Sequence, residues 1–237
     1  MKLSAPIYRL KRRARVLSRQ QAIPYHQALD RVARDEGFDS WSLLASHASM
    51  STPAKRLKAE LHNGDLVLVG ARPGHGKTLL SLEIAVEAMK AGQRSVFFSL
   101  ECTKDDVAQY FTAVGEDLLR YTDRFDFDDS DGICASYIVG QMQSAAAGTI
   151  VIIDYLQLLD QKRENPNLTE QVRQLKAFAK VRGLIVVFVS QIRRDYDSRD
   201  RAVPTLKDVR LPNPLDLTLF DRACFLNDGA LEFAAIG

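Results

Sequence analysis

The chain has 237 residues, of which 46% are hydrophobic and 26% are charged, and its formal net charge is +2. This composition is typical of a globular protein with a sizeable core, and no apolar run approaches the roughly 18–20 residues of a membrane span. The N-terminus is basic but lacks the apolar segment of a secretory signal. We therefore expect a cytoplasmic protein without a membrane partner.

The three cysteines, Cys102, Cys134 and Cys224, are widely spaced and odd in number. This spacing favours free, buried thiols over a disulfide framework or a metal cluster. The four histidines are scattered along the chain, so we expect no zinc site.

Charge is distributed unevenly along the sequence. Residues 1–58 hold 12 Lys and Arg against 4 Asp and Glu, a net charge of +8, whereas the remainder holds 20 against 26, a net charge of −6. A basic segment followed by an acidic remainder is one charge pattern found in proteins that bind nucleic acid.

The basic segment, residues 1–48, predicts a module of three helices. Apolar residues recur at helical spacing over residues 6–20, a second helix begins at Pro24 and ends at Gly37, and a third follows Ser40, a plausible N-cap. The basic side chains of the first helix are either a solvated face or a nucleic-acid surface, with Arg9, Arg12 and Arg13 as the candidates. Residues 49–56 read as a linker, and residues 57–237 as one larger domain.

The larger domain opens with a strand over residues 65–70, a glycine-rich turn, and an amphipathic helix from Lys77 to Ala91. This order is typical of a phosphate-binding P-loop, in which backbone N–H groups and the helix N-terminus attract an anion. Lys77 is the candidate for contacting phosphate, and Thr78 the candidate magnesium ligand. The strict P-loop pattern has glycine where this chain has Ala71, so a chance glycine-rich turn is the alternative. The candidate nucleotide-binding residues are Ala71, Arg72, Pro73, Gly74, His75, Gly76, Lys77, Thr78 and Leu79.

Two acidic residues follow predicted strands. Glu101 comes directly after a strand over residues 95–100, and there it can activate the attacking water or simply be an acid at a helix N-terminus. Asp154 ends a β-branched run that begins at Thr149, which is the pattern of a buried parallel strand carrying a magnesium carboxylate. The alternative for Asp154 is a turn cap.

A further buried strand over residues 184–190 places Gln191 at its tip, where an amide can sense the γ-phosphate. The loop after it is rich in charge, and Arg193 and Arg194 are further nucleic-acid candidates. An Asn-Asp-Gly turn at residues 227–229 predicts a hairpin near residue 237. Strands that alternate with helices predict an α/β fold, with a mostly parallel sheet covered by helices on both faces.

Five segments resemble the motifs of the DnaB-type replicative DNA helicases, a branch of the RecA-like P-loop ATPases. They are A-R-P-G-H-G-K-T at 71–78, F-S-L-E at 98–101, D-Y-L-Q-L at 154–158, V-S-Q-I-R-R at 189–194 and P-T-L-K-D-V-R at 204–210. The resemblance implies ATP and Mg²⁺ as cofactors. It also implies Lys77 as phosphate ligand, Glu101 as catalytic base, Gln191 as sensor, and Thr78 and Asp154 as metal ligands. Family members form hexameric rings that translocate on single-stranded DNA.

Departures from that family leave three hypotheses. No segment matches the family's basic C-terminal segment, which supplies an arginine finger, and a basic module stands in place of the family's N-terminal domain. The chain is expected to be an ATPase that couples nucleotide state to binding of nucleic acid, with single-stranded DNA favoured. The alternatives are a switch or recruitment protein with little hydrolysis, in phage defence or plasmid maintenance, and a compact helicase in which Arg193, Arg194 or Arg210 replaces the finger.

Overall fold

The computed structural model describes residues 3–5, 7–50, 52–160, 164–193, 195–196, 203–211, 213–227 and 230–236. The chain divides into two compact units, residues 1–56 and 57–237. Each unit has a hydrophobic core of its own. No helix among the described residues is long and apolar enough to cross a membrane.

The N-terminal unit is built from three helices, α1 (Ile7–Gln21), α2 (Tyr25–Asp35) and α3 (Trp41–Met50). Each helix contributes to one small core, because its apolar residues recur on one side. The fully buried members of that core are Leu10, Ala14, Ala28, Val32, Ala33 and Leu44. Ser40 caps α3 by accepting a 3.3 Å hydrogen bond from the N–H of Leu43.

The segment that we expected to be a linker, residues 49–56, contains the end of one helix and the start of the next. Helix α3 continues to Met50, and α4 (Pro53–Glu60) begins three residues later. Proline is well suited to a first helical position, where its missing N–H has no intrahelical partner to lose. Helix α4 crosses the boundary between the two units, and its Leu57 is buried.

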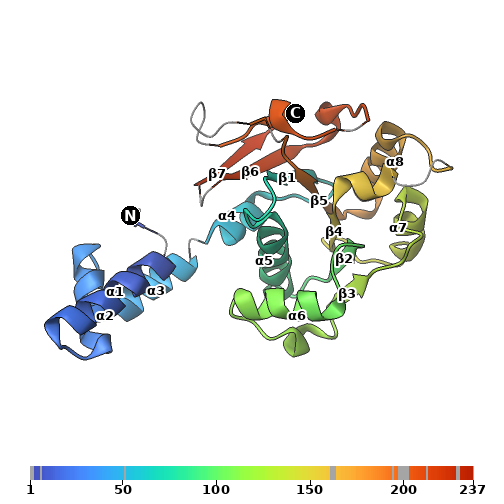
Figure 1. Ribbon diagram of the computed structural model, residues 1–237. Helices are drawn as coiled ribbons and strands as arrows, with labels where there is room; N and C mark the ends of the chain where they lie inside the picture. The colour runs from blue at the N-terminus through green and yellow to red at the C-terminus, as the bar shows by residue number, and fades with distance from the viewer. Residues whose placement is uncertain are drawn as a thin grey trace. The chain divides into compact units, whose positions relative to one another are not determined.

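The larger unit contains a sheet of seven strands in the order β3-β2-β4-β5-β1-β6-β7 (Figure 1). All neighbouring strands are parallel except β6 and β7, which form an antiparallel hairpin. The strands are β1 (Leu66–Ala71), β2 (Ser95–Ser99), β3 (Phe125–Asp128), β4 (Ile150–Asp154), β5 (Ile185–Gln191), β6 (Arg222–Asn227) and β7 (Ala230–Ala235).

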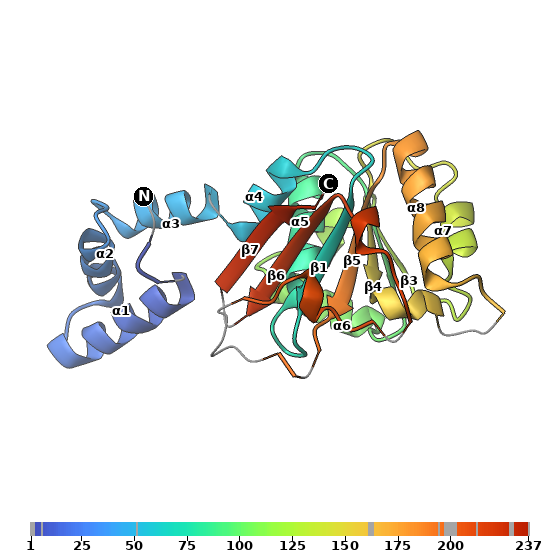
Figure 2. The same ribbon diagram turned by 90° about the horizontal axis from the view of Figure 1, so that it is seen from above.

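Helices cover both faces of this sheet. Helices α5 (Lys77–Lys90) and α6 (Lys104–Ala113) lie on one face, and α7 (Ala135–Gln141) and α8 (Leu168–Arg182) lie on the other (Figures 1 and 2). Short 3-10 helices complete the unit, namely η1 (Leu118–Tyr121), η2 (Leu156–Asp160), η3 (Leu206–Asp208) and η4 (Leu217–Leu219). The expected α/β fold with a mostly parallel, doubly covered sheet is confirmed.

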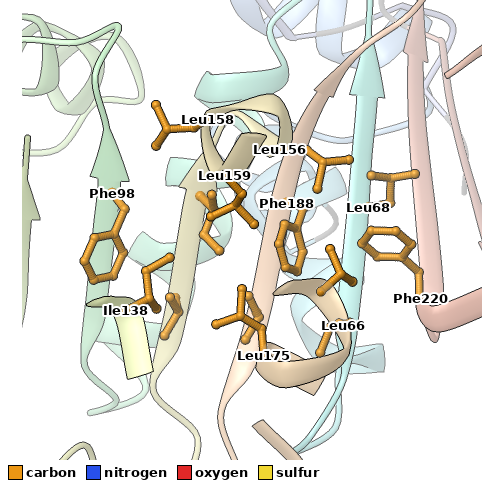
Figure 3. Packing of buried hydrophobic residues seen from close by; sticks show 14 of the residues in the cluster. Leu66, Leu68, Phe98, Ile138, Leu156, Leu158, Leu159, Leu175, Phe188 and Phe220 are labelled. Carbon is orange, nitrogen blue, oxygen red and sulfur yellow. The ribbon is translucent and has the colours of Figure 1, made fainter. Parts of the chain in front are cut away.

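The main core lies between the sheet and helices α7 and α8. Alternate strand residues such as Leu68, Phe98 and Phe188 point toward Ile138 of α7 and Leu175 of α8 (Figure 3). The intervening residues of the same strands point to the opposite face, where α5 packs against β1, β4 and β5. Burial on both faces explains why these strands read as unbroken apolar runs.

Strand β4 is shorter than its apolar run. The strand ends at Asp154, and the apolar residues that follow form η2 instead of extending the strand. Leu156, Leu158 and Leu159 of this turn are still buried in the main core (Figure 3). The apolar run therefore predicts which residues are buried, but it does not predict the residue at which the strand ends.

Candidate functional site

The glycine-rich turn joins β1 directly to α5. Gly74 and Gly76 have φ of 79° and 82°, the left-handed region that glycine adopts without steric cost. No atom lies within 4 Å of a Cβ built on either residue, so the backbone angle, and not lack of space, requires glycine here. Within the turn, His75 donates its backbone N–H to the carbonyl of Arg72 (3.2 Å).

The turn presents the N-terminus of α5. Gly76 is the N-cap and supplies no side-chain acceptor. Among the described residues, the first backbone N–H of α5 that has an acceptor is that of Leu80, which donates to the carbonyl of Gly76 (2.9 Å). The amides of Lys77, Thr78 and Leu79 therefore point outward with the positive end of the helix, an arrangement that suits an anion.

A hydrogen bond links α5 to the tip of β4. The Thr78 hydroxyl donates to Asp154 Oδ2 at 2.7 Å, and only 2% of Asp154 is exposed. Burial raises the pKa of the Asp154 carboxyl, the Thr78 hydrogen bond and the charge of Lys77 lower it, and the charge of Glu101 raises it further. The two candidate metal ligands, Thr78 and Asp154, are thus in contact. The charges of Lys77 and Glu101 both influence the pKa of the Asp154 carboxyl.

Asp154 retains one unsatisfied oxygen. Its Oδ1 atom is buried and has no hydrogen-bond partner. A buried carboxylate oxygen without a partner is costly unless a cation binds it. Carboxylate and hydroxyl oxygens are the ligands that Mg²⁺ prefers. The residues present therefore fit a magnesium ion held by Thr78 and Asp154.

Glu101 lies beside this pair, at the end of β2. Ser99, the last residue of β2, pairs with Asp154 in the sheet register, and its Oγ accepts the N–H of Glu101 (3.1 Å). Glu101 is exposed, and its charge also contributes to the raised pKa of Tyr155, after the larger effect of burial. Helix α6 is capped by Thr103 and Asp106, so Glu101 does not serve as its cap.

Gln191 is the last residue of β5 and pairs with Ala71 of β1. Its side-chain oxygen accepts a 3.1 Å hydrogen bond from Arg210 Nη1, and its backbone carbonyl accepts the N–H of Arg210 at 2.8 Å. The carbonyl of Arg210 is held in turn by Gln157 Nε2 at 2.5 Å. The sequence singled out Arg210 only as a stand-in for an arginine finger, and no pattern in it indicated this contact with the sensor position.

Arg210 also borders a hollow of about 580 Å³. Arg193 and Lys207 line the same hollow, together with four apolar residues. Arg193 forms an ion pair with Asp195, in which Nε lies 3.0 Å from Oδ1. Arg194, the second candidate in this loop, lies outside the described residues.

The candidates in the N-terminal unit differ in their surroundings. Arg13 is engaged in an ion pair with Asp35 (2.8 Å) and lies 4.0 Å from Glu36, so it ties α1 to the end of α2. Arg12 is exposed and has no ion-pair partner in the described part of the chain. Arg9 lies in α1, and its side chain is outside the described set.

The three cysteines are free, as expected, but they are not all buried. Cys102 and Cys224 are buried, whereas Cys134, the N-cap residue of α7, is half-buried. Burial raises the pKa of the Cys224 thiol to about 12.

A family model supports the interpretation of these motifs. The model of the DnaB-like helicase C-terminal domain matches residues 53–118 and 122–214, which is more than half of the chain. The chain belongs to the DnaB-like helicase C-terminal domain family. The resemblance drawn from the five motifs is therefore confirmed, and the matched region contains the turn, Glu101, Asp154, Gln191 and Arg210.

Individual relatives of this DnaB-like chain are replicative helicases by name. It is 27% identical over 190 residues to the replicative DNA helicase DnaB of Leifsonia xyli subsp. xyli, covering 67% of this chain and 42% of that protein. It is 29% identical over 192 residues to the replicative DNA helicase DnaC of Bacillus subtilis, again covering 67% and 42%. The DnaB-like chain thus spans less than half the length of these relatives.

Solved structures agree on the RecA-like fold. A DnaB-like replicative helicase, described with its primase interactions, has a TM-score of 0.58 at 20% identity and covers 96% of this chain and 73% of its own. A KaiC-like protein from the archaeon Pyrococcus horikoshii has a TM-score of 0.51 at 18% identity and covers 68% and 70%. At this identity the likeness shows the fold of the DnaB-like chain and nothing beyond it.

Proposed function

We propose that this DnaB-like chain binds ATP with Mg²⁺, hydrolyses it, and couples its nucleotide state to the binding of single-stranded DNA. The observation that carries the proposal is the contact between Thr78 and Asp154, with the second Asp154 oxygen buried and unpartnered. This contact brings the glycine-rich turn, a carboxylate and the end of β2 to one edge of the sheet, where open α/β folds bind ligands.

Each residue of the site then has a specific role. The outward amides of Lys77, Thr78 and Leu79, with the Lys77 ammonium, bind the phosphates. Thr78 and Asp154 hold the magnesium ion, which supplies positive charge that stabilises the transferring phosphoryl group. Glu101, exposed beside this pair, orients the attacking water and accepts its proton.

Gln191 and Arg210 are proposed to carry the coupling. Gln191 lies at the strand tip next to Ala71, and its side chain is held by Arg210. Arg210 also lines the hollow that contains Arg193 and Lys207, where DNA phosphates would find cationic partners. If hydrolysis changes the contact of Gln191 with Arg210, Arg210 would therefore move within the proposed DNA-binding hollow. Strand separation, which the names of the relatives denote, and assembly into a ring are further proposals for this chain.

Binding and hydrolysis of ATP test the proposal. We expect magnesium-dependent ATPase activity in the full chain, increased by single-stranded DNA. Lys77→Ala should weaken ATP binding by roughly 10- to 100-fold, the equivalent of one charged hydrogen bond. Lys104→Ala, which removes an exposed lysine at the start of α6, is the matched control and should bind ATP normally. Unchanged ATP binding in Lys77→Ala would refute the proposed nucleotide site, whereas ATP binding without turnover in the parent chain would favour the switch hypothesis.

A further inference from the structure

Helix α1 has two clearly different sides. Leu10 and Ala14 are buried in the core of the N-terminal unit, with exposed fractions of 1% and 0%. Each residue of an α-helix is turned by about 100° from the one before it, and one arc of about 100° on α1 excludes both Leu10 and Ala14. That arc carries four exposed cationic residues, which we call the α1 cationic surface: Lys11, Arg12, Arg15 and Arg19.

The charge of this surface is not neutralised within the unit. No carboxylate forms an ion pair with any of its four residues in the described part of the chain. Three of the four acids of the unit are engaged elsewhere. Asp35 pairs with Arg13, and Asp30 accepts the N–H of Trp41 (2.8 Å). Glu36 accepts two hydrogen bonds from Ser4, which lower the pKa of its carboxyl. The surface therefore has a concentrated positive field, which attracts a polyanion.

An exposed aromatic ring belongs to the same surface. Tyr25, the first residue of α2, is 38% exposed, and the Arg15 guanidinium lies 6.0 Å from the centre of its ring. Aromatic rings set among cationic side chains are the usual means of binding single strands, because unpaired bases stack on the ring while the cations contact the backbone. A duplex offers no unstacked base to such a ring.

The surface is less suited to a membrane. A helix that binds at a bilayer inserts an apolar face among the lipids. The apolar face of α1 is already buried against the rest of the N-terminal unit, with Leu10 and Ala14 in its core. Only the exposed Val16 adds apolar area beside the cations in the described part of the helix.

We propose that the α1 cationic surface and Tyr25 form a binding site for single-stranded nucleic acid. Lys11, Arg15 and Arg19 follow one another at four-residue intervals, so their Cα atoms are spaced about 6 Å apart along the helix axis. This row contacts successive phosphates while Tyr25 stacks on a base. The site lies outside residues 53–118 and 122–214, so none of its residues belongs to the region that matches the family model, and none lines the hollow described above. Arg13, one of the three candidates from the sequence, supports the surface through Asp35 and is not part of it.

The test measures binding of labelled oligothymidylate to the full chain without nucleotide, at salt concentrations between about 50 and 200 mM. The triple variant Lys11→Gln/Arg15→Gln/Arg19→Gln should bind more weakly, and the slope of log K against log[salt] should fall by about 2 because the three phosphate contacts of the row are lost. The matched control, Lys104→Gln/Arg120→Gln/Lys180→Gln, removes the same charge from exposed positions of the larger unit and should keep most of the slope. An unchanged slope in the first variant, or an equal fall in both, would overturn the proposal.

Tyr25 separates stacking from charge. Tyr25→Leu should weaken binding of the single strand by about 5- to 100-fold, whereas Tyr25→Phe, which keeps the ring, should bind normally. Thermal unfolding of each variant confirms that the module is folded. Equal or tighter binding of a duplex, or of vesicles containing phosphatidylserine, would contradict the choice of ligand.

Failure here can be told apart from failure of the proposed function. The triple variant should keep the ATPase rate measured without DNA, and Lys77→Ala should keep the nucleotide-free binding of oligothymidylate. ATPase activity with no effect of the triple variant on DNA binding would refute the α1 surface alone.

Discussion

Thr78 Oγ1 lies 2.7 Å from Asp154 Oδ2, and this contact joins two residues that are 76 positions apart in the sequence. Thr78 is in the first turn of α5, and Asp154 is the last residue of β4. The hydroxyl satisfies one oxygen of a carboxyl that is almost completely buried, while the other oxygen remains without a partner. The protein therefore buries a carboxyl group of which only one oxygen has a hydrogen-bond partner.

Replacing the Asp154 carboxyl by an amide should stabilise the fold and abolish the proposed ATP hydrolysis. Because burial raises the pKa of Asp154, its ionised form is disfavoured, and the stability associated with its protonated form is lost as the pH rises through that raised pKa. Asp154→Asn should increase the free energy of unfolding at neutral pH, and the gain should shrink as the pH falls below the ordinary Asp pKa of about 3.9, where the parent carboxyl is protonated in both states. Urea unfolding across this pH range measures the difference, and a loss of stability at neutral pH would contradict the prediction. Magnesium-dependent ATP hydrolysis should be lost in the same variant.

Glu101 should affect turnover and leave binding intact. Glu101→Gln keeps the size of the side chain but cannot accept a proton, so the hydrolysis rate should fall by roughly 10²- to 10⁴-fold, the usual contribution of a general base. ATP affinity, measured by calorimetry, should change little. Asp105→Asn, an exposed acid in the first turn of α6, is the control and should turn over normally. A similar loss in both variants would show that general electrostatics, and not proton transfer, is responsible.

Variants of Arg210 and Arg193 should distinguish the effect of ATP on DNA affinity from DNA affinity itself. Both residues line the same hollow, but of the two only Arg210 donates a hydrogen bond to the Gln191 side chain. In the parent chain, we expect ATP to change the DNA affinity by about 5- to 150-fold, the usual range of coupling between sites. Arg210→Gln should bring this ratio close to one, whereas Arg193→Gln should weaken DNA binding with and without ATP and preserve the ratio. Fluorescence anisotropy in both nucleotide states measures it. A preserved ratio in Arg210→Gln would remove the Gln191–Arg210 contact from the coupling.

A side chain at Gly70 should destabilise the protein, because the buried ring of Phe225 occupies the space that a Cβ would need. A Cβ at this position would lie 2.7 Å from Phe225 Cε1, too close for the buried ring on β6 to accept without moving. Gly70→Ala should lower the free energy of unfolding by about 1–3 kcal/mol, and Phe225→Leu in the same chain should recover part of the loss. Gly140→Ala in α7, where no atom lies within 4 Å of the new Cβ, should instead stabilise by about 0.5–1 kcal/mol. Chemical denaturation of these variants checks both signs.

The parts of the site that depend on local patterns could be predicted from the sequence. The glycine-rich turn, Glu101, Asp154 and Gln191 each follow a β-branched or aromatic run, and parallel strands bring their carboxyl ends to the same edge of a sheet. The register bears this out in the larger unit, because Ser99 pairs with Asp154, and Ala71 pairs with Gln191.

Contacts between distant side chains could not be predicted in this way. The hydrogen bond from Arg210 to Gln191 depends on how the segment after β5 returns to the strand tip, through the bridge between Ile192 and Val209. The ion pair of Arg13 with Asp35 depends on the packing of α1 against α2. The sequence shows that Arg210 and Arg13 are cationic, but tertiary structure determines which residue each one contacts. The periodicity of helices and strands carries no information on such contacts.

During synthesis, β1 leaves the ribosome long before either of its neighbours in the sheet. Its partners are β5 and β6, which begin at Ile185 and Arg222, so Leu66–Ala71 has no strand to pair with until most of the chain has emerged. A six-residue segment that is fully buried in the finished protein is then a nascent strand with both edges open, which makes it a target for chaperones or for aggregation. The turn that follows β1 is therefore among the first parts of the larger unit to be translated and among the last to acquire its final surroundings.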